Sequence, residues 1–322
     1  MTYYLKYRPQ LIDDLDIATV RESLFNISKT KNIPHAFLFS GPKGTGKTSA
    51  ARILSKIINC EQLKDDSEPC NTCASCIAIA NGTSIDVIEM DAASNRGIDD
   101  IRLLRDMIKL SPANSRAKVY IIDEAHMLTT EASNALLKTL EEPPSHVYFI
   151  LATTNPEKLI DTIKSRTTIV NFSKATAEET KRSLRRIVVD EKIKITNEKV
   201  DKIIKKAKGS FRDAVKILEQ YSNDETVLDT NLTFDAQEFV QLIMTKDDKK
   251  IIEQLKKILS SGVAVQVITE EILEVLEKQL VEDSNTKVIP LIELILSLQE
   301  FNKVSPIEEL PLEVALIKWC II

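Results

Sequence analysis

Apolar and polar residues follow one another in short blocks along the first half of the chain. The apolar blocks are brief and almost continuous, as expected for strands that are buried on both faces of a parallel sheet. Helical patterns lie between these blocks, so residues 1–173 are predicted to form a doubly wound α/β domain. The predicted strands are 36–40, 86–90, 118–122, 147–152 and 168–172.

The second half of the chain has no strand pattern. Residues 174–222 predict about three helices, and the polar, turn-rich stretch 223–235 is interpreted as a linker. Farther on, apolar positions recur at i, i+3 and i+4, as in 251–259 and 268–280. The predicted domains are therefore an α/β domain (1–173), a small helical domain (174–222) and an all-α domain (223–322).

Composition and charge narrow the function classes. The chain is 43% apolar and 28% charged, as in ordinary globular proteins. It has no apolar run near the roughly 20 residues of a membrane helix and no apolar signal-peptide core, so we expect a cytoplasmic protein without a membrane partner. Residues 174–220 carry a net charge of +6 and residues 221–322 one of −10. The acidic part is a poor candidate for binding DNA phosphates, whereas the basic part is either a DNA surface or a solvated helical face.

A phosphate-binding loop follows the first predicted strand. The sequence matches G-x-x-x-x-G-K-[ST], with a strand before it and a helix after it, which is the context that this motif requires. The glycines allow backbone N–H groups to surround phosphate oxygens, and the helix N-terminus adds partial positive charge. Lys47 is expected to reach the β- and γ-phosphates of ATP, and the Thr48 hydroxyl to ligate Mg²⁺. The predicted nucleotide-binding residues here are Gly41, Pro42, Lys43, Gly44, Thr45, Gly46, Lys47, Thr48 and Ser49.

Two adjacent carboxylates end the third predicted strand. Asp123 is expected to hold Mg²⁺ and Glu124 to orient and activate the water that attacks the γ-phosphate. A strand-end surface pair is the simpler interpretation, but the phosphate loop about 75 residues earlier favours the catalytic one. His126 is interpreted as a structural or coupling residue behind the carboxylates, because phosphoryl transfer needs positioning more than an imidazole.

Four of the five cysteines lie within one short segment, residues 60–76. Cys60, Cys70, Cys73 and Cys76 have the spacing C-x₉-C-x₂-C-x₂-C, which predicts four thiolates around one structural Zn²⁺. An iron–sulfur cluster is the minor alternative, and disulfides are disfavoured in a reducing cytosol.

Taken together, these motifs resemble the γ/τ-type ATPase subunit of the bacterial DNA polymerase III clamp loader, an AAA+ protein. The resemblance is strong from residue 1 to about 222 and weaker beyond. It implies an AAA+ P-loop domain with a zinc insert, a helical lid and an all-α collar. Besides the loop and the cysteines, it rests on 91–95 (DAASN), 123–128 (DEAHML), 134–144 (NALLKTLEEPP), 151–156 (LATTNP), 165–166 (SR) and 209–214 (GSFRDA).

The resemblance also implies roles for residues outside the loop. Arg166 corresponds to the arginine finger, which acts on ATP bound by a neighbouring subunit. Thr154 corresponds to the sensor near the γ-phosphate, and Arg212 to the second sensor, on the lid. Arg8 and Pro9, with Tyr7 before them, match the N-terminal segment near the adenine, although a turn fixed by Pro9 explains them as well.

The sequence departs from the family pattern at two places. Residues 15–18 (LDIA) stand where relatives commonly have Val-Gly-Gln, which leaves the details of base recognition open. Thr167 stands where a cysteine usually follows the Ser-Arg pair. Because the chain ends with the collar, it resembles the short γ-like form.

A basic stripe is a candidate DNA surface. Arg102, Arg105 and Lys109 lie at i, i+3 and i+7 of a predicted helix and would touch phosphates without reading sequence. A solvated helical face with local acidic partners explains the stripe equally well.

The sequence therefore predicts an ATP-hydrolysing clamp-loader motor subunit that uses ATP, Mg²⁺ and Zn²⁺. Its implied partners are other loader subunits, including copies of itself, the sliding clamp and primer–template DNA. Three alternatives remain: a non-catalytic structural loader subunit, another AAA+ DNA-remodelling ATPase, and a zinc-based interaction platform with vestigial ATPase activity.

Overall fold

The structure is a computed structural model of the 322-residue chain. It describes residues 2–321 except 31, 66, 95–96, 98–103, 105, 229–233, 283 and 299–304. The chain divides into two compact units, Met1–Leu228 and Asp229–Ile322. No helix among the described residues is long and apolar enough to cross a membrane.

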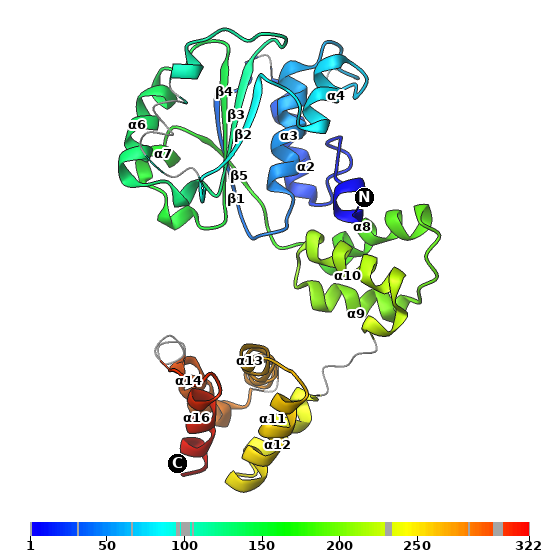
Figure 1. Cartoon of the computed structure of the whole chain (residues 1–322), viewed down its shortest axis with the longest axis vertical. Helices are drawn as coiled ribbons and strands as arrows, with labels where there is room; N and C mark the ends of the chain where they lie inside the picture. The colour runs from blue at the N-terminus through cyan, green and yellow to red at the C-terminus, as the bar shows by residue number, and fades with distance from the viewer. Residues whose placement is uncertain are drawn as a thin grey trace. The chain divides into compact units, whose positions relative to one another are not determined.

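A five-stranded parallel sheet forms the centre of the first unit (Figure 1). The strand order is β2-β3-β4-β1-β5, so β1 lies between β4 and β5. All five predicted strands are confirmed to within one residue at either end. They are β1 (Ala36–Ser40), β2 (Val87–Asp91), β3 (Lys118–Asp123), β4 (Val147–Thr153) and β5 (Thr168–Asn171).

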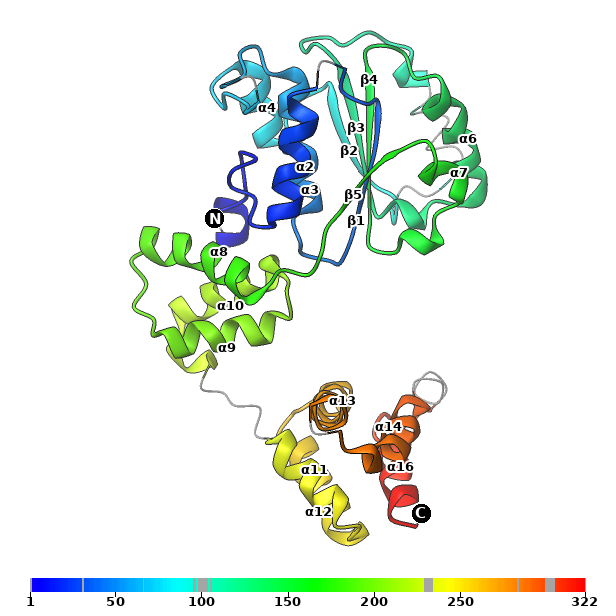
Figure 2. The ribbon, with the colours of Figure 1, turned by 180° about the vertical axis from the view of Figure 1, so that it is seen from behind.

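Helices cover both faces of this sheet, as Figures 1 and 2 show from opposite sides. Successive residues of β1 face opposite ways: Phe37 and Phe39 belong to one buried cluster, and Leu38 to the other. Burial on both faces explains why the strands are continuously apolar in sequence. The helices α2 (Ala18–Ser28), α3 (Lys47–Asn59) and α4 (Ala74–Asn81) lie on one side, and α6 (Thr130–Glu141) and α7 (Asp161–Lys164) on the other.

Three helices follow β5 and have a core of their own. Polar side chains cap all three N-termini: Thr176 forms a capping box with Glu179, while Thr196 and Ser210 each accept a backbone N–H. The short helix α1 (Tyr3–Lys6) comes from the chain start, and Tyr3 and Tyr7 pack against this core. The three helices are α8 (Ala177–Asp190), α9 (Asn197–Ala207) and α10 (Phe211–Asn223).

The division between the units falls after residue 228, whereas the sequence placed the last boundary at 222/223. Helix α10 continues to Asn223, and a 3-10 helix, η3 (Glu225–Leu228), occupies the start of the stretch interpreted as a linker.

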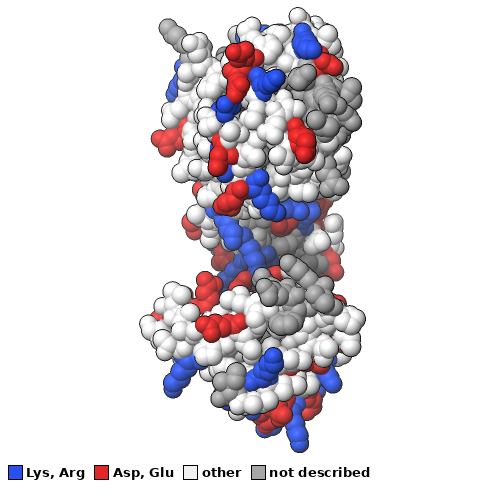
Figure 3. All heavy atoms as spheres, turned by 90° about the vertical axis from the view of Figure 1, so that its left-hand side faces the viewer, with Lys and Arg blue, Asp and Glu red and all other residues white. Residues whose placement is uncertain are grey.

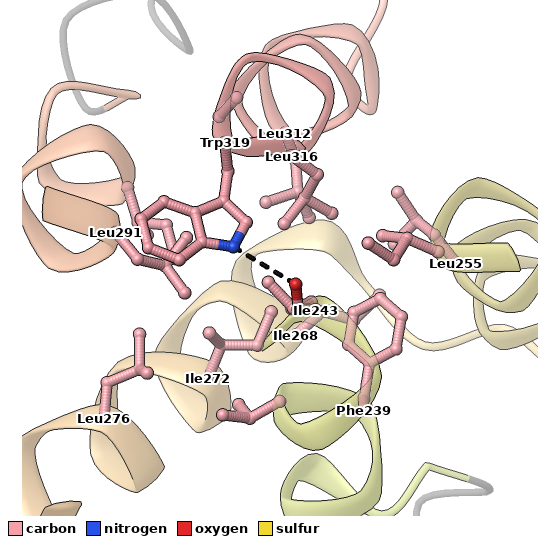
Figure 4. Packing of buried hydrophobic residues seen from close by; sticks show 14 of the residues in the cluster. Phe239, Ile243, Leu255, Ile268, Ile272, Leu276, Leu291, Leu312, Leu316 and Trp319 are labelled. Atoms are coloured by element: carbon pink, nitrogen blue, oxygen red, sulfur yellow. Dashed lines mark hydrogen bonds between the residues drawn. The ribbon is translucent and has the colours of Figure 1, made fainter. Parts of the chain in front are cut away.

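The second unit is entirely helical in its described residues. Its core centres on Trp319, whose indole Nε1 donates a hydrogen bond to the Ile243 carbonyl oxygen at 3.1 Å (Figure 4). Leu255, Ile268 and Leu316 are fully buried around this contact. The elements are α11 (Ala236–Met244), α12 (Asp248–Ser260), α13 (Val265–Val281), η4 (Thr286–Val288), α14 (Ile289–Leu296) and α16 (Leu310–Ile321).

Candidate nucleotide site and candidate metal centre

The predicted phosphate-binding loop connects the carboxyl end of β1 to α3. Gly41 and Gly44 have φ angles of +148° and +78°, in the region that favours glycine. A Cβ atom on Gly41 would lie 2.0 Å from the Phe172 carbonyl oxygen, and one on Gly44 would lie 2.1 Å from the Ser210 hydroxyl oxygen. Only glycine fits at either place, so the loop runs directly against the end of β5 and the start of α10.

Lys47 is buried beneath this loop. Its Nζ donates hydrogen bonds to the carbonyl oxygens of Gly41 at 2.7 Å and Pro42 at 2.8 Å. Burial lowers the pKa of Lys47, while the nearby Glu124 and Asp123 carboxylates oppose that shift. The ammonium group is thus held inside the curve of the loop, within reach of an anion bound there.

Thr48 and Asp123 meet at the first turn of α3. The Thr48 hydroxyl donates a hydrogen bond to Asp123 Oδ2 at 2.8 Å, although 75 residues separate the two in sequence. Hydroxyl and carboxylate oxygens are the hard ligands that Mg²⁺ prefers, and the remaining positions of a magnesium shell suit water and phosphate. This pair therefore fits the predicted magnesium site.

Glu124 directly follows β3 in a left-handed backbone conformation, with a φ angle of +48°. Its Oε2 accepts hydrogen bonds from the Thr154 hydroxyl at 2.9 Å and the Thr154 amide at 3.3 Å. His126 Nδ1 lies 3.4 Å from the same oxygen and 3.0 Å from the Thr153 hydroxyl. A non-glycine residue in this conformation costs free energy, so the surrounding contacts must hold Glu124 in place.

One cleft contains most of the predicted nucleotide-binding residues. Arg8 and Pro9 reach it from the chain start, and Arg212 from α10. The Arg8 Nε donates a hydrogen bond to the Ser49 hydroxyl at 3.2 Å, and burial lowers the pKa of the Arg8 guanidinium, helped by the positive charge of Arg52. Lys43, Gly44, Thr45, Gly46, Lys47, Thr48, Ser49, Asp123 and Glu124 also line the cleft.

The same cleft has an apolar wall that the sequence did not reveal. Its side chains come from four places: the chain start, residues 15–20 at and before the start of α2, the end of β5 and the first half of α10. In sequence they look like ordinary core residues, and the only signal was the unusual segment 15–18. The apolar lining comprises Tyr4, Leu5, Leu15, Ile17, Val20, Phe172, Phe211 and Val215.

Arg166 does not join this cleft. It lines a shallow hollow with His35 and Ala36, at the amino end of β1, whereas the phosphate loop follows the carboxyl end of that strand. A five-residue strand spans about 16 Å, so Arg166 is out of reach of its own phosphate loop. Its guanidinium, about one-third exposed, donates to Glu141 and, at 2.8 Å, to the Thr162 carbonyl oxygen.

The four clustered cysteines converge on one point beside α3 and α4. Their sulfur atoms all lie within 4.8 Å of one another, and Cys70 and Cys76 are 4.0 Å apart. A tetrahedral Zn²⁺ with bonds of about 2.3 Å needs sulfur separations of about 3.8 Å, so the cluster fits a zinc ion. Of the four thiols, Cys60, Cys70 and Cys76 are buried.

Backbone amides support the cluster. The amides of Thr72 and Cys73 donate hydrogen bonds to the Cys70 sulfur at 3.4 and 3.3 Å. Hydrogen bonds from Thr72 lower the pKa of Cys70 to about 5, while burial raises the pKa values of Cys60 and Cys76. A ligand that is already a thiolate favours metal capture, and such outer-shell donors are typical of structural metal sites.

The predicted basic stripe lies largely outside the described residues. Arg102 and Arg105 are not described, and the exposed Lys109 donates to Asp106 at 3.0 Å. On the face in Figure 3, Lys and Arg side chains lie among Asp and Glu side chains and uncharged atoms.

Comparisons with known proteins show which family the chain is similar to. The family profile described as "DNA polymerase III, delta subunit" matches residues 18–176. The DNA polymerase III subunit tau of Bacillus subtilis is 48% identical over 218 residues, covering 67% of this chain and 38% of that protein. The gamma/tau subunit of Mycoplasma genitalium is 38% identical over 272 residues, covering 81% of this chain and 45% of that protein.

The chain belongs to the γ/τ family of DNA polymerase III subunits. It spans less than half the length of these two relatives. A solved Thermotoga maritima RuvB structure, a "Holliday junction branch migration motor", matches with a TM-score of 0.50 and 21% identity, covering 69% of this chain and 67% of that one. This likeness shows that the γ/τ-type chain has an AAA+ fold.

Proposed function

We propose that this chain is an ATP-hydrolysing motor subunit of a DNA clamp loader, which loads the sliding clamp onto primer–template DNA. One observation carries the proposal: Lys47, the Thr48–Asp123 pair and Glu124 converge on the phosphate loop. These are the parts that phosphoryl transfer to water requires, and a subunit that only held a ring together would not need them.

Each of these residues has a part in hydrolysis. Lys47 would hold the β- and γ-phosphates, and Thr48 with Asp123 would hold Mg²⁺, which neutralises charge that develops on the phosphates. Glu124 would orient the attacking water and accept its proton. Thr154, already hydrogen-bonded to Glu124, would sense the γ-phosphate beside it.

Arg166 would act in trans. It lies at the opposite end of β1 from its own phosphate loop, so its guanidinium is available only to a nucleotide on a neighbouring subunit. There it would stabilise the negative charge that develops in the transition state. The site is then complete only in an assembly, with other loader subunits and with copies of this chain.

The lid and the chain start would respond to the nucleotide. Arg212 lines the cleft from α10 and would sense the phosphates, while Arg8 and Pro9 would lie near the base. The zinc ion on Cys60, Cys70, Cys73 and Cys76 would fold the segment next to α3 and would have no catalytic role, because four thiolates close its shell. The all-helical second unit would serve as the collar of the ring.

The deciding experiment is ATP hydrolysis by the assembled loader with the clamp, in the presence and absence of primed DNA. Glu124→Gln and Arg166→Ala are expected to abolish the stimulated hydrolysis while the complex still assembles. Matched controls are Glu157→Gln, an exposed carboxylate in the 3-10 helix η2 (Pro156–Lys158) after β4, and Lys164→Ala, a cation two residues before Arg166 that pairs with Asp161.

The alternatives give other results. A structural subunit, or a vestigial ATPase with a zinc-based interaction platform, would assemble without contributing hydrolysis, so Glu124→Gln would change nothing. A different AAA+ machine would hydrolyse ATP without a response to the clamp.

A further inference from the structure

Two arginines of the lid helix α8 converge on one buried carboxylate at the chain start. Arg182 Nε lies 2.9 Å from Asp16 Oδ1, and Arg186 Nη2 lies 2.5 Å from Asp16 Oδ2. The Arg182 guanidinium also donates to the Asp16 backbone carbonyl oxygen. Asp16 is only 6% exposed, so its carboxylate lies out of bulk water. Each of its two oxygens is paired with a guanidinium of α8.

The same helix holds the chain start at further points. Glu179 Oε1 accepts the backbone N–H of Ala18 at 3.3 Å. Near the other end of α8, Glu191 Oε1 accepts hydrogen bonds from Lys6 at 2.7 Å and from the Tyr7 hydroxyl at 2.8 Å. Residues 6–18 are therefore attached to α8 along its length. Among these contacts, in the described part of the chain, Asp16 is the only ion-paired carboxylate that is buried.

The attached segment forms one wall of the candidate nucleotide cleft. Pro9, Leu15, Asp16 and Ile17 of this segment line the cleft, and Arg186 of α8 lines it as well. This wall is largely apolar, which suits the flat faces of a nucleotide base, whereas the glycine loop and its charged neighbours suit phosphates. The Asp16 contacts thus join the lid to the part of the cleft that fits a base.

The burial of the Asp16 carboxylate makes this contact stronger than a surface ion pair. Asp16 is buried, so the loss of either arginine would leave a buried charge with less compensation, which costs more than the loss of an exposed pair. With Asp16 neutralised, Arg182 and Arg186 would turn to solvent, and α8 would lose its strongest hold on residues 14–18. The apolar wall would then no longer be preformed before a nucleotide arrives.

We propose that Asp16 is a positioning residue for the nucleotide: its ion pairs with Arg182 and Arg186 fasten the lid to the wall that receives the base. The inference rests on the proposed function only in that the cleft binds a nucleotide; it needs neither hydrolysis nor a clamp.

The test is isothermal titration of the full chain with ADP and, separately, with inorganic tripolyphosphate, which has no base. Asp16→Asn keeps the shape of the side chain and removes its charge. For this variant, the Kd for ADP is expected to rise by about tenfold, which lies within the usual range for coupling between two sites of a protein. The Kd for tripolyphosphate should stay within about twofold of the wild-type value. In an Arg182→Gln background the same change is expected to have a smaller effect, because the two residues act through one contact.

Asp201→Asn is the matched control. It removes a carboxylate that pairs with Lys181 of α8 at 3.1 Å but touches no part of the chain start, and it should leave both affinities unchanged. Thermal unfolding checks that each variant is folded. If Asp16→Asn is not folded, Arg182→Lys takes its place, because it keeps the positive charge but loses the planar guanidinium. This variant is expected to weaken ADP binding more mildly.

Three results would overturn the inference. An unchanged ADP affinity in Asp16→Asn would show that the wall does not depend on these ion pairs. If the Kd values for ADP and for tripolyphosphate rise equally, the substitution has caused a general loss of structure. If the effects of Asp16→Asn and Arg182→Gln on ADP binding are fully additive, the two residues do not act through one contact. Failure of the wild-type chain to bind ADP would instead remove the nucleotide site itself and the proposed function with it.

Discussion

The Thr154 hydroxyl donates a hydrogen bond to Glu124 Oε2 at 2.9 Å, which joins the carboxyl ends of two neighbouring strands, β3 and β4. Glu124 is the proposed water-activating residue. Because of this hydrogen bond, its carboxylate is already restrained before any substrate binds. The Thr154 amide contacts the same oxygen, which leaves Oε1 as the oxygen that is free of this restraint. The pair thus sets the direction in which Glu124 faces.

Replacing Thr154 should therefore slow hydrolysis more than it weakens ATP binding. Thr154→Val keeps the volume of the side chain and removes the donor. A hydrogen bond to a charged group contributes about 1.5–3 kcal/mol, so we expect kcat to fall by roughly tenfold or more. Steady-state ATPase assays of the assembled loader measure kcat, and nucleotide titration measures binding.

Thr154→Ser is the matched control, because it restores the hydroxyl and should recover most of the rate. Equal rates for the valine and serine variants would show that the hydroxyl contact to Glu124 has no part in turnover.

The cysteine cluster should bind one zinc ion per chain. Cys70→Ser removes one of the four sulfur ligands, so we expect loss of the metal and a lower unfolding temperature for the first unit. Metal analysis of the purified protein and calorimetry test both effects. Cys320→Ser is the control, since this thiol lies in α16 of the other unit and should leave the zinc content unchanged. Iron in place of zinc would support the alternative cluster.

The sequence predicted the parts of the site that depend on local pattern. The strands, the glycine loop and the carboxylates after β3 have strong local signals, because buried parallel strands are apolar and phosphate loops need glycine. The cysteines were equally clear from their spacing. The roles of Thr154 and Arg212 came from the family resemblance.

Contacts between distant segments were not predictable in this way. Asp16 lies 166 residues before Arg182, and no periodicity or motif connects them. The same holds for Arg166 and Glu141, whose pairing depends on how α6 and the segment after α7 pack together. Ion pairs of this kind follow from the assembled fold, because charged side chains look alike in sequence whether they face solvent or a partner.

A buried aspartate should make the first unit sensitive to acid. Asp86 is 1% exposed and accepts backbone N–H groups from Ala113, Asn114 and Ser115, each at 2.8 Å. Burial alone would raise the pKa of Asp86, but these hydrogen bonds outweigh it and lower the pKa. The unfolded chain then binds the proton more readily, so the contribution is complete above the unfolded pKa of about 3.9 and is lost as the pH falls through the folded pKa.

We therefore expect Asp86→Asn to destabilise the first unit at pH 7 by about 1–3 kcal/mol, the cost of weakening hydrogen bonds to a buried charge. The difference from wild type should shrink below about pH 4, where Asp86 of the unfolded chain begins to take up a proton. Urea unfolding followed by far-UV circular dichroism at pH 7 and pH 3.5 gives both values. A difference that does not change with pH would mean that the charge of Asp86 is not what stabilises this loop.

The second unit carries its own stability probe, because Trp319 is the one tryptophan of the chain and is buried in that unit's core. Leu316 lies one turn before Trp319 on α16 and is fully buried, so Leu316→Ala should leave a cavity and cost about 2–5 kcal/mol. Leu310→Ala, at an exposed position of the same helix, should cost far less. Urea unfolding followed by tryptophan fluorescence reports on this unit specifically, and the midpoint should fall for Leu316→Ala alone. Equal midpoints for the two variants would contradict the packing around Trp319, since only a buried leucine has neighbours that lose contacts when it is shortened.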